Sequence, residues 1–264
     1  MDYGAPILSL RYKGVETVAS HQNPEEYIND STYLCKTVGR YGNRIGKSRF
    51  TLDGREYILV PNEGDNQLHG GPMSFCERVW DVIADEDSIR MSISSPDGDN
   101  GFPGNLTMSV IFTIVADALH IDFEGETDML TVFAPTIHPY FLCDGAQMIL
   151  NAGNHVEVDG ELIPTGNIVP CSGKYDYTSW RTVTDDLDDA FVIESDYALT
   201  YANKDFKMEV WTDFPAVQVY SGSSLGVAIE PEFYPDSPNH ENFPDTTLHP
   251  GNKFRKYCEY KFVD

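Results

Sequence analysis

Short segments in which apolar and polar residues alternate recur along this chain. They include residues 49–52, 56–60, 91–94, 106–114, 119–124, 155–158, 191–193, 208–211 and 216–220. Because successive side chains of a β-strand point to opposite faces, this alternation predicts strands with one buried face. No long segment repeats its apolar residues at helical spacing between capping residues. The pattern therefore predicts an all-β protein.

Turn-forming residues separate these segments. Asp53-Gly54 lies between residues 49–52 and 56–60, and Asp-Gly suits a tight hairpin that needs positive φ angles. Gly, Asp and Asn also follow many of the other segments, which is typical of a large antiparallel β-sandwich or barrel. Neither a Pro/Ser-rich linker nor an abrupt change in composition divides the 264 residues. We therefore expect a single domain, 1–264, because all-β domains often reach this length.

Acidic residues dominate the charge, with 42 Asp and Glu against 18 Lys and Arg and a net charge of −24. Such a surface repels phosphate backbones and anionic lipids, so we expect no nucleic-acid partner and no membrane association. The five cysteines are widely spaced and form no CxxC pair, which is typical of reduced thiols rather than disulfides or a zinc site. No apolar run approaches the roughly 18 residues of a membrane helix, and no secretory signal is visible. These features predict a cytoplasmic protein.

Three segments carry a histidine or a glutamate between strand-like runs. They are residues 66–71 with His69, residues 136–141 with His138, and residues 230–239 with Glu230. Imidazoles and a carboxylate gathered by a β scaffold can supply the acid and the base for proton transfer near neutral pH. Glu230 follows the apolar run 225–229, where burial would raise the pKa of a carboxylate. Taken alone, each histidine is also compatible with a structural role in the core.

Together with residues 39–45, these segments resemble the aldose 1-epimerase (galactose mutarotase) family. The matching residues include Asn66, Leu68, His69, Gly70 and Gly71; His138, Tyr140 and Phe141; and Glu230, Pro235, Asp236 and Asn239. The resemblance implies a galactose mutarotase-like supersandwich, a large antiparallel β-sandwich. It also implies an isomerase that interconverts the α and β anomers of a free aldose by acid–base ring opening and closure. Glu230 would be the base and His138 the acid, with an ordinary imidazole pKa near 6.5, and His69 would assist near the ring oxygen.

The same resemblance implies a set of sugar-binding residues, namely Asn43, Arg44, Asp188 and Gln218. A guanidinium fork and an acceptor carboxylate suit hydrogen bonds to sugar hydroxyls. The reaction requires no metal ion, nucleotide or covalent nucleophile, so we expect no cofactor and no metal site. The expected partner is a small-molecule sugar, and the expected assembly is a monomer or a homodimer.

Three departures from the family pattern concern the substrate rather than the reaction. Ile137 and Leu142 stand where Asn is usual, and Glu232 stands where Gln is usual. They leave open a related epimerase or isomerase on a modified sugar, and a non-catalytic carbohydrate-binding module is the other alternative. Glu230 and Glu232 share one face of a strand, at a spacing that a retaining glycosidase could use. Two acids on one strand rarely flank opposite faces of a sugar, so we disfavour a glycosidase.

Overall fold

Two large antiparallel sheets dominate the computed structural model, which describes residues 1–264. In spatial order, the nine-stranded sheet consists of β18 (Arg181–Thr182), β15 (Gln147–Leu150), β20 (Tyr197–Ala202), β21 (Lys207–Thr212), β25 (Phe254–Val263), β11 (Ala118–Thr127), β10 (Leu106–Val115), β9 (Ser88–Ser95) and β8 (Asp81–Ala84). The six-stranded sheet consists of β14 (Tyr140–Phe141), β23 (Gly226–Glu232), β22 (Ala216–Ser223), β19 (Asp188–Val192), β16 (Asn154–Val158) and β17 (Pro164–Pro170).

Short elements complete the chain. The two-stranded sheets pair β1 (Arg11–Tyr12) with β2 (Val15–Glu16), β3 (Thr37–Val38) with β13 (Thr136–Ile137), β4 (Arg44–Ile45) with β7 (Gln67–Leu68), β5 (Arg49–Leu52) with β6 (Arg55–Ile58), and β12 (Thr131–Val132) with β24 (Thr247–Leu248). Helix α1 spans Pro24–Ile28, and 3₁₀ turns occupy Gly46–Ser48, Phe75–Glu77, Asp99–Gly101, Gly173–Tyr175 and Ser237–Asn239. No helix in the structure is both long and apolar enough to cross a membrane.

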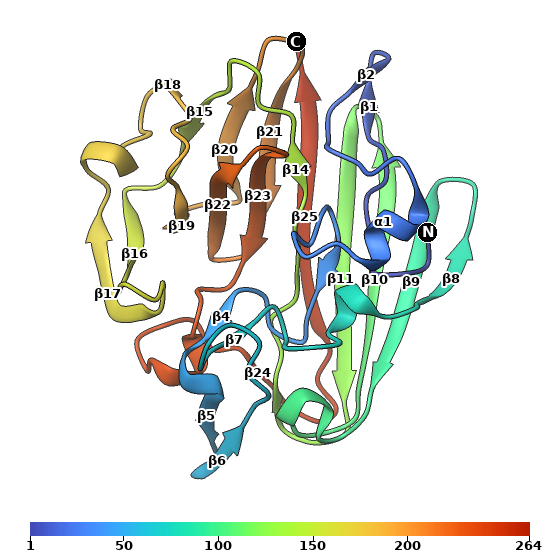
Figure 1. Cartoon of the computed structure of the whole chain (residues 1–264), viewed down its shortest axis with the longest axis vertical. Coiled ribbons are helices and arrows are strands. Elements are labelled where there is room, and N and C mark those ends of the chain that lie inside the picture. The colour runs from blue at the N-terminus through green and yellow to red at the C-terminus, as the bar shows by residue number, and fades with distance from the viewer.

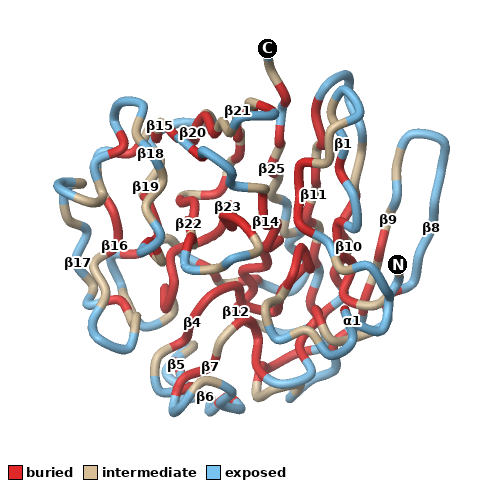
Figure 2. The backbone as a smooth tube through the Cα atoms, turned by 45° about the horizontal axis from the view of Figure 1, so that its top comes forward, coloured by how far each residue is buried: buried red, intermediate tan, exposed pale blue.

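The two sheets pack face to face, and the six-stranded sheet lies over part of the larger one (Figure 1). The hydroxyl of Tyr260 on β25 donates to the carbonyl of Ile229 on β23 at 2.9 Å, and its ring lies 5.1 Å from that of Phe141 on β14. The interface is part of a core of 53 buried hydrophobic residues, which also includes residues of the N-terminal segment. Figure 2 shows β23 and most of β22 as buried, whereas the edge strand β8 is exposed along its length.

These features confirm the predicted all-β class and the large antiparallel sandwich. Every segment that alternation marked as a strand overlaps an observed strand of the structure. The Asp53-Gly54 turn joins β5 to β6, and both residues have positive φ, 49° and 73°. The strand pattern alone left a barrel open, because alternation reveals one buried face without showing how sheets close.

Candidate active site

A polar cleft of about 250 Å³ opens where β4 and β7 approach the six-stranded sheet. Its 14 lining residues are Ser31, Thr32, Tyr33, Asn43, Arg44, Leu68, His69, His138, Tyr140, Asp188, Gln218, Tyr220, Ser223 and Glu230. The set includes all seven residues that were predicted from the sequence to be catalytic or sugar-binding. The fold thus brings together side chains that lie nearly two hundred positions apart along the chain.

Glu230 lies within β23, where its neighbour across the strand pair is Gln218 of β22. Every residue of β23 is buried, and Glu230 is only 2% exposed. The strand keeps the carboxyl at the floor of the cleft, where Oε2 has no hydrogen-bond partner within the protein. An unpartnered, buried carboxyl oxygen in a polar cleft is available to a substrate hydroxyl.

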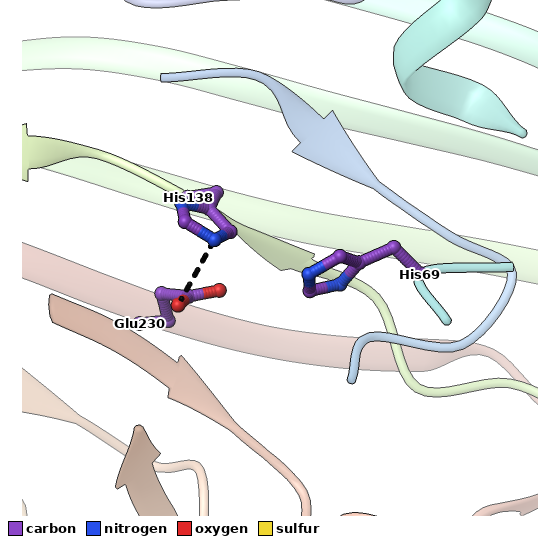
Figure 3. Close-up of side chains that lie close together, drawn as sticks. All are labelled: His69, His138 and Glu230. Carbon is purple, nitrogen blue, oxygen red and sulfur yellow. Dashed lines mark ion pairs between the residues drawn. The ribbon is translucent and has the colours of Figure 1, made fainter. Parts of the chain in front are cut away.

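His138 lies on the short link between β13 and β14, opposite Glu230. Its backbone N–H donates to Lys36 at 3.0 Å, and its carbonyl accepts from Cys35 at 3.0 Å, so the main chain is fixed on both sides. The ring nitrogen Nε2 lies 3.3 Å from Oε1 of Glu230, and both side chains are buried (Figure 3). An imidazole and a carboxyl at this distance can share or exchange a proton.

His69 follows β7 and points its ring toward this pair (Figure 3). The residue has a φ of 51°, and Gly70 and Gly71 continue with φ of 87° and 90°. The N–H of Asn43 donates to Nδ1 of His69 at 3.0 Å, and the N–H of His69 donates to the carbonyl of Asn43 at 3.0 Å. Because Nδ1 is an acceptor, a neutral His69 ring carries its proton on Nε2.

Arg44, Asp188 and Gln218 line the cleft beside Glu230, and a hydrogen bond and an ion pair connect them. Nε2 of Gln218 donates to Asp188 at 2.6 Å, and Arg44 lies 3.7 Å from the same carboxylate. The guanidinium also binds Glu63 with two bonds, of 2.7 and 3.0 Å. Of the acidic run 185–189, Asp188 is the member that faces the cleft, whereas Asp189 is buried and accepts from the N–H of Asp188.

Comparison with known proteins decides the family. The model of the aldose 1-epimerase family matches residues 1–261. The aldose 1-epimerase of Escherichia coli is 32% identical, and the match covers all of this chain and 91% of that protein. The galactose mutarotase of Bos taurus is 28% identical over 99% of this chain and 90% of its own length. The chain belongs to the aldose 1-epimerase family.

Solved structures agree with this family assignment. An aldose epimerase homologue from C. elegans superimposes with a TM-score of 0.93 and 26% identity, and the match covers 99% of this chain and 94% of that one. A galactose 1-epimerase from Lactobacillus acidophilus, 24% identical, shares the fold with a TM-score of 0.89 over 99% and 89% of the two chains. Proteins named in this family are isomerases, which agrees with the class of enzyme expected from the sequence.

Burial determines the charge of the two central groups of this aldose 1-epimerase family member. It lowers the pKa of His138 to about 4. It also raises the pKa of Glu230 well above its usual value, and the nearby Glu232 and Asp188 act in the same direction. The expectation of a raised carboxylate pKa agrees with the structure, but the ordinary imidazole pKa near 6.5 was wrong. The sequence motif does not reveal that the His138 ring is removed from water, which disfavours its charged form.

The three groups His69, His138 and Glu230 also lie close enough to be considered as metal ligands, with one atom of each within 4.8 Å of the others. A neutral imidazole has one nitrogen lone pair, and in His69 that lone pair already accepts the N–H of Asn43. His69 therefore offers the cleft a hydrogen-bond donor rather than a ligand. Two remaining ligands do not make a three-ligand catalytic site of the zinc type.

Among the residues at or beside the cleft that the sequence did not predict, three are tyrosines and one is an acidic partner of Arg44. The ring of Tyr33 lies 4.5 Å from that of His69, and Tyr140 and Tyr220 also line the cavity. Strand alternation could have found the latter two, since each lies two residues beyond a nominated one, His138 or Gln218. Tyr33 and the Arg44 partner Glu63 lie outside regular strands, where no sequence period indicates which way a side chain points.

Proposed function

We propose that this protein is an aldose 1-epimerase, with Glu230 as the base and His138 as the acid. The observation that carries the proposal is the 3.3 Å approach of these two groups in a polar cleft, in a chain of this family. Only one of the two neighbouring glutamates, Glu230, lines the cavity, which argues against a glycosidase pair.

The proposed reaction uses these two groups in turn as acid and base. Glu230 removes the proton from the C1 hydroxyl while His138 donates a proton to the ring oxygen, and the bond between C1 and that oxygen breaks. The resulting aldehyde rotates about its C1–C2 bond. Closure on the other face returns one proton to the C1 oxygen from Glu230 and one from the former ring oxygen to His138. The net change is the configuration of C1, and the enzyme ends as it began.

The remaining cleft residues hold the sugar during this exchange. Nε2–H of His69 donates to the ring oxygen or to a neighbouring hydroxyl, which supports the same step as His138. Arg44 supplies N–H donors, Asp188 supplies acceptors, and Gln218 fixes the orientation of Asp188. Asn43 acts through His69, because its N–H selects the ring tautomer.

Polarimetry of freshly dissolved α-D-glucose, α-D-galactose and pentoses tests the proposal. Acceleration of optical relaxation above the buffer rate supports it. Relaxation at the buffer rate for every aldose would favour the two alternatives, an epimerase on a modified sugar or a carbohydrate-binding module. A monomeric or homodimeric assembly and a cytoplasmic location stay predictions, which light scattering and cell fractionation would test.

A further inference from the structure

Glu232 is a second carboxyl that β23 buries beside the proposed base. It stands two residues after Glu230, so the two side chains leave the strand on the same face. Glu232 is 1% exposed and does not line the cleft. The family resemblance gives Gln at this position, so the carboxyl is a property of this chain and not a requirement of the shared reaction.

The surroundings of Glu232 accommodate its carboxyl with a single hydrogen bond. Nδ2 of Asn43 donates to Oε1 at 2.9 Å, whereas Oε2 has no partner. Gly42 leaves the room for Oε2, since a Cβ built on Gly42 would lie 3.3 Å from this oxygen. Neither Glu232 nor Glu230 forms an ion pair with Lys or Arg.

The charged and titratable groups around this carboxyl pair come from several elements. Arg44 favours the ionised forms, although Glu63 and Asp188 already neutralise its charge. Asp188 opposes ionisation. His138 and His69 are neutral because burial lowers both pKa values. Tyr41, Tyr140 and Tyr260 pack nearby as neutral phenols, with raised pKa values.

Under these influences the two carboxyls ionise one after the other. Burial raises the pKa of Glu232 to about 8, and the Asn43 hydrogen bond opposes part of that rise. No amide donates to Glu230 as Asn43 does to Glu232, and a charged Glu232 adds to the effect of burial on the pKa of Glu230. Glu232 is therefore the member that becomes negative first as the pH rises.

We propose that the Glu232 carboxylate, once ionised, opposes loss of the last proton from the Glu230–His138 pair and so extends activity to more alkaline solution. The geometry carries this inference, because a negative charge buried on the same strand face opposes loss of a proton from its neighbour. At acidic pH Glu232 is uncharged and leaves the pair unaffected. The kinetic part of the inference rests on the proposed function, whereas the titration part does not.

Carboxyl ¹³C NMR of protein labelled in its glutamates tests the titration, with Glu230→Gln and Glu232→Gln used to assign the two signals. In the wild type we expect two separate titration steps. The chemical shift of each carboxyl should change in both steps, because the two groups are coupled. In Glu232→Gln we expect the Glu230 signal to titrate about one pH unit lower. Asp185→Asn removes the same charge from an exposed residue that does not line the cleft, and it should leave both signals unchanged.

The same variants separate this inference from the proposed function. If the wild type catalyses mutarotation, the alkaline limb of kcat/KM should move to lower pH in Glu232→Gln while the acidic limb stays in place. The inference would be overturned if Glu230 titrated at the same pH in the wild type and in Glu232→Gln. It would also be overturned if the two wild-type signals titrated independently of each other. A shifted titration in a protein without mutarotase activity would support the titration part of the inference and refute the proposed function, together with the kinetic part that rests on it.

Discussion

Nε2 of His138 lies 3.3 Å from Oε1 of Glu230, and burial disfavours charge on both groups. The pair therefore holds one proton, mainly on Glu230, with a neutral imidazole beside it. The proposed reaction requires that proton on His138 and an ionised Glu230. Both forms contain the same number of protons, so their ratio changes with pH only where a neighbouring group such as Glu232 titrates.

This relationship predicts a broad plateau in the pH profile of kcat/KM. Activity should fall on the acidic side only when the pair gains a second proton, near the pKa of about 4 of His138. It should fall on the alkaline side when the last proton leaves Glu230, whose pKa is raised. Mutarotation rates across the pH range, corrected for the buffer reaction, check this expectation. An acidic limb near pH 6.5, the ordinary imidazole value, would contradict it.

The buried Glu232 predicts an unusual dependence of stability on pH. Its pKa is about 8 in the folded protein against 4.5 for a free side chain. Between these values the folded state retains a proton that the unfolded state has lost, so this group makes the wild type less stable as the pH rises. Glu232→Gln cannot titrate at this position and therefore lacks this loss of stability. Between the two pKa values, its free energy of unfolding should rise relative to that of the wild type by about 1.4 kcal/mol per pH unit. Urea unfolding of both proteins at several pH values measures this difference in the free energy of unfolding. A difference that does not change with pH would show that Glu232 is already ionised in the folded protein.

Arg44 predicts a binding defect rather than a chemical one. Arg44 lines the cleft but contacts neither the proposed acid His138 nor the proposed base Glu230. Arg44→Ala should therefore raise KM by roughly 10- to 100-fold with a smaller change in kcat. Arg49→Ala provides the control, since Arg49 is exposed and pairs with Glu56 at 3.8 Å. Equal losses of kcat and kcat/KM in Arg44→Ala would instead place its contribution in the transition state.

Much of the fold and the site could be predicted from the sequence, for identifiable reasons. The alternation of apolar and polar residues predicted β10 and β11, because each strand buries one face. The Asp53-Gly54 pair predicted a hairpin, because its turn requires positive φ. The seven cleft residues were predicted from a resemblance. The lowered pKa of His138 and the Glu63 contact with Arg44 were not, since both depend on long-range packing.

Gly70 predicts a stability defect that the sequence motif alone does not explain. A Cβ at this position would lie 2.1 Å from the carbonyl oxygen of Gly39, and the φ of 87° already disfavours a side chain. Gly70→Ala should therefore lower the free energy of unfolding by more than about 2 kcal/mol. Gly64→Ala is the matched control, because it also has positive φ but meets no atom within 4 Å, and it should cost only about 1 kcal/mol. Similar losses in the two variants, measured by thermal unfolding, would exclude the clash as the cause.

Magnetisation exchange between the α and β anomeric protons of an aldose at equilibrium tests the central claim most directly. The method measures interconversion without a starting excess of either anomer, and line broadening of the same signals reports sugar binding. We predict that the wild type accelerates the exchange and that Glu230→Gln slows it by roughly 10²–10⁴-fold while still binding sugar, because an amide cannot accept the C1 proton. Glu232→Gln, the same substitution two residues away, should remain active at neutral pH. Wild-type exchange rates in Glu230→Gln would contradict the account and move the base to another residue.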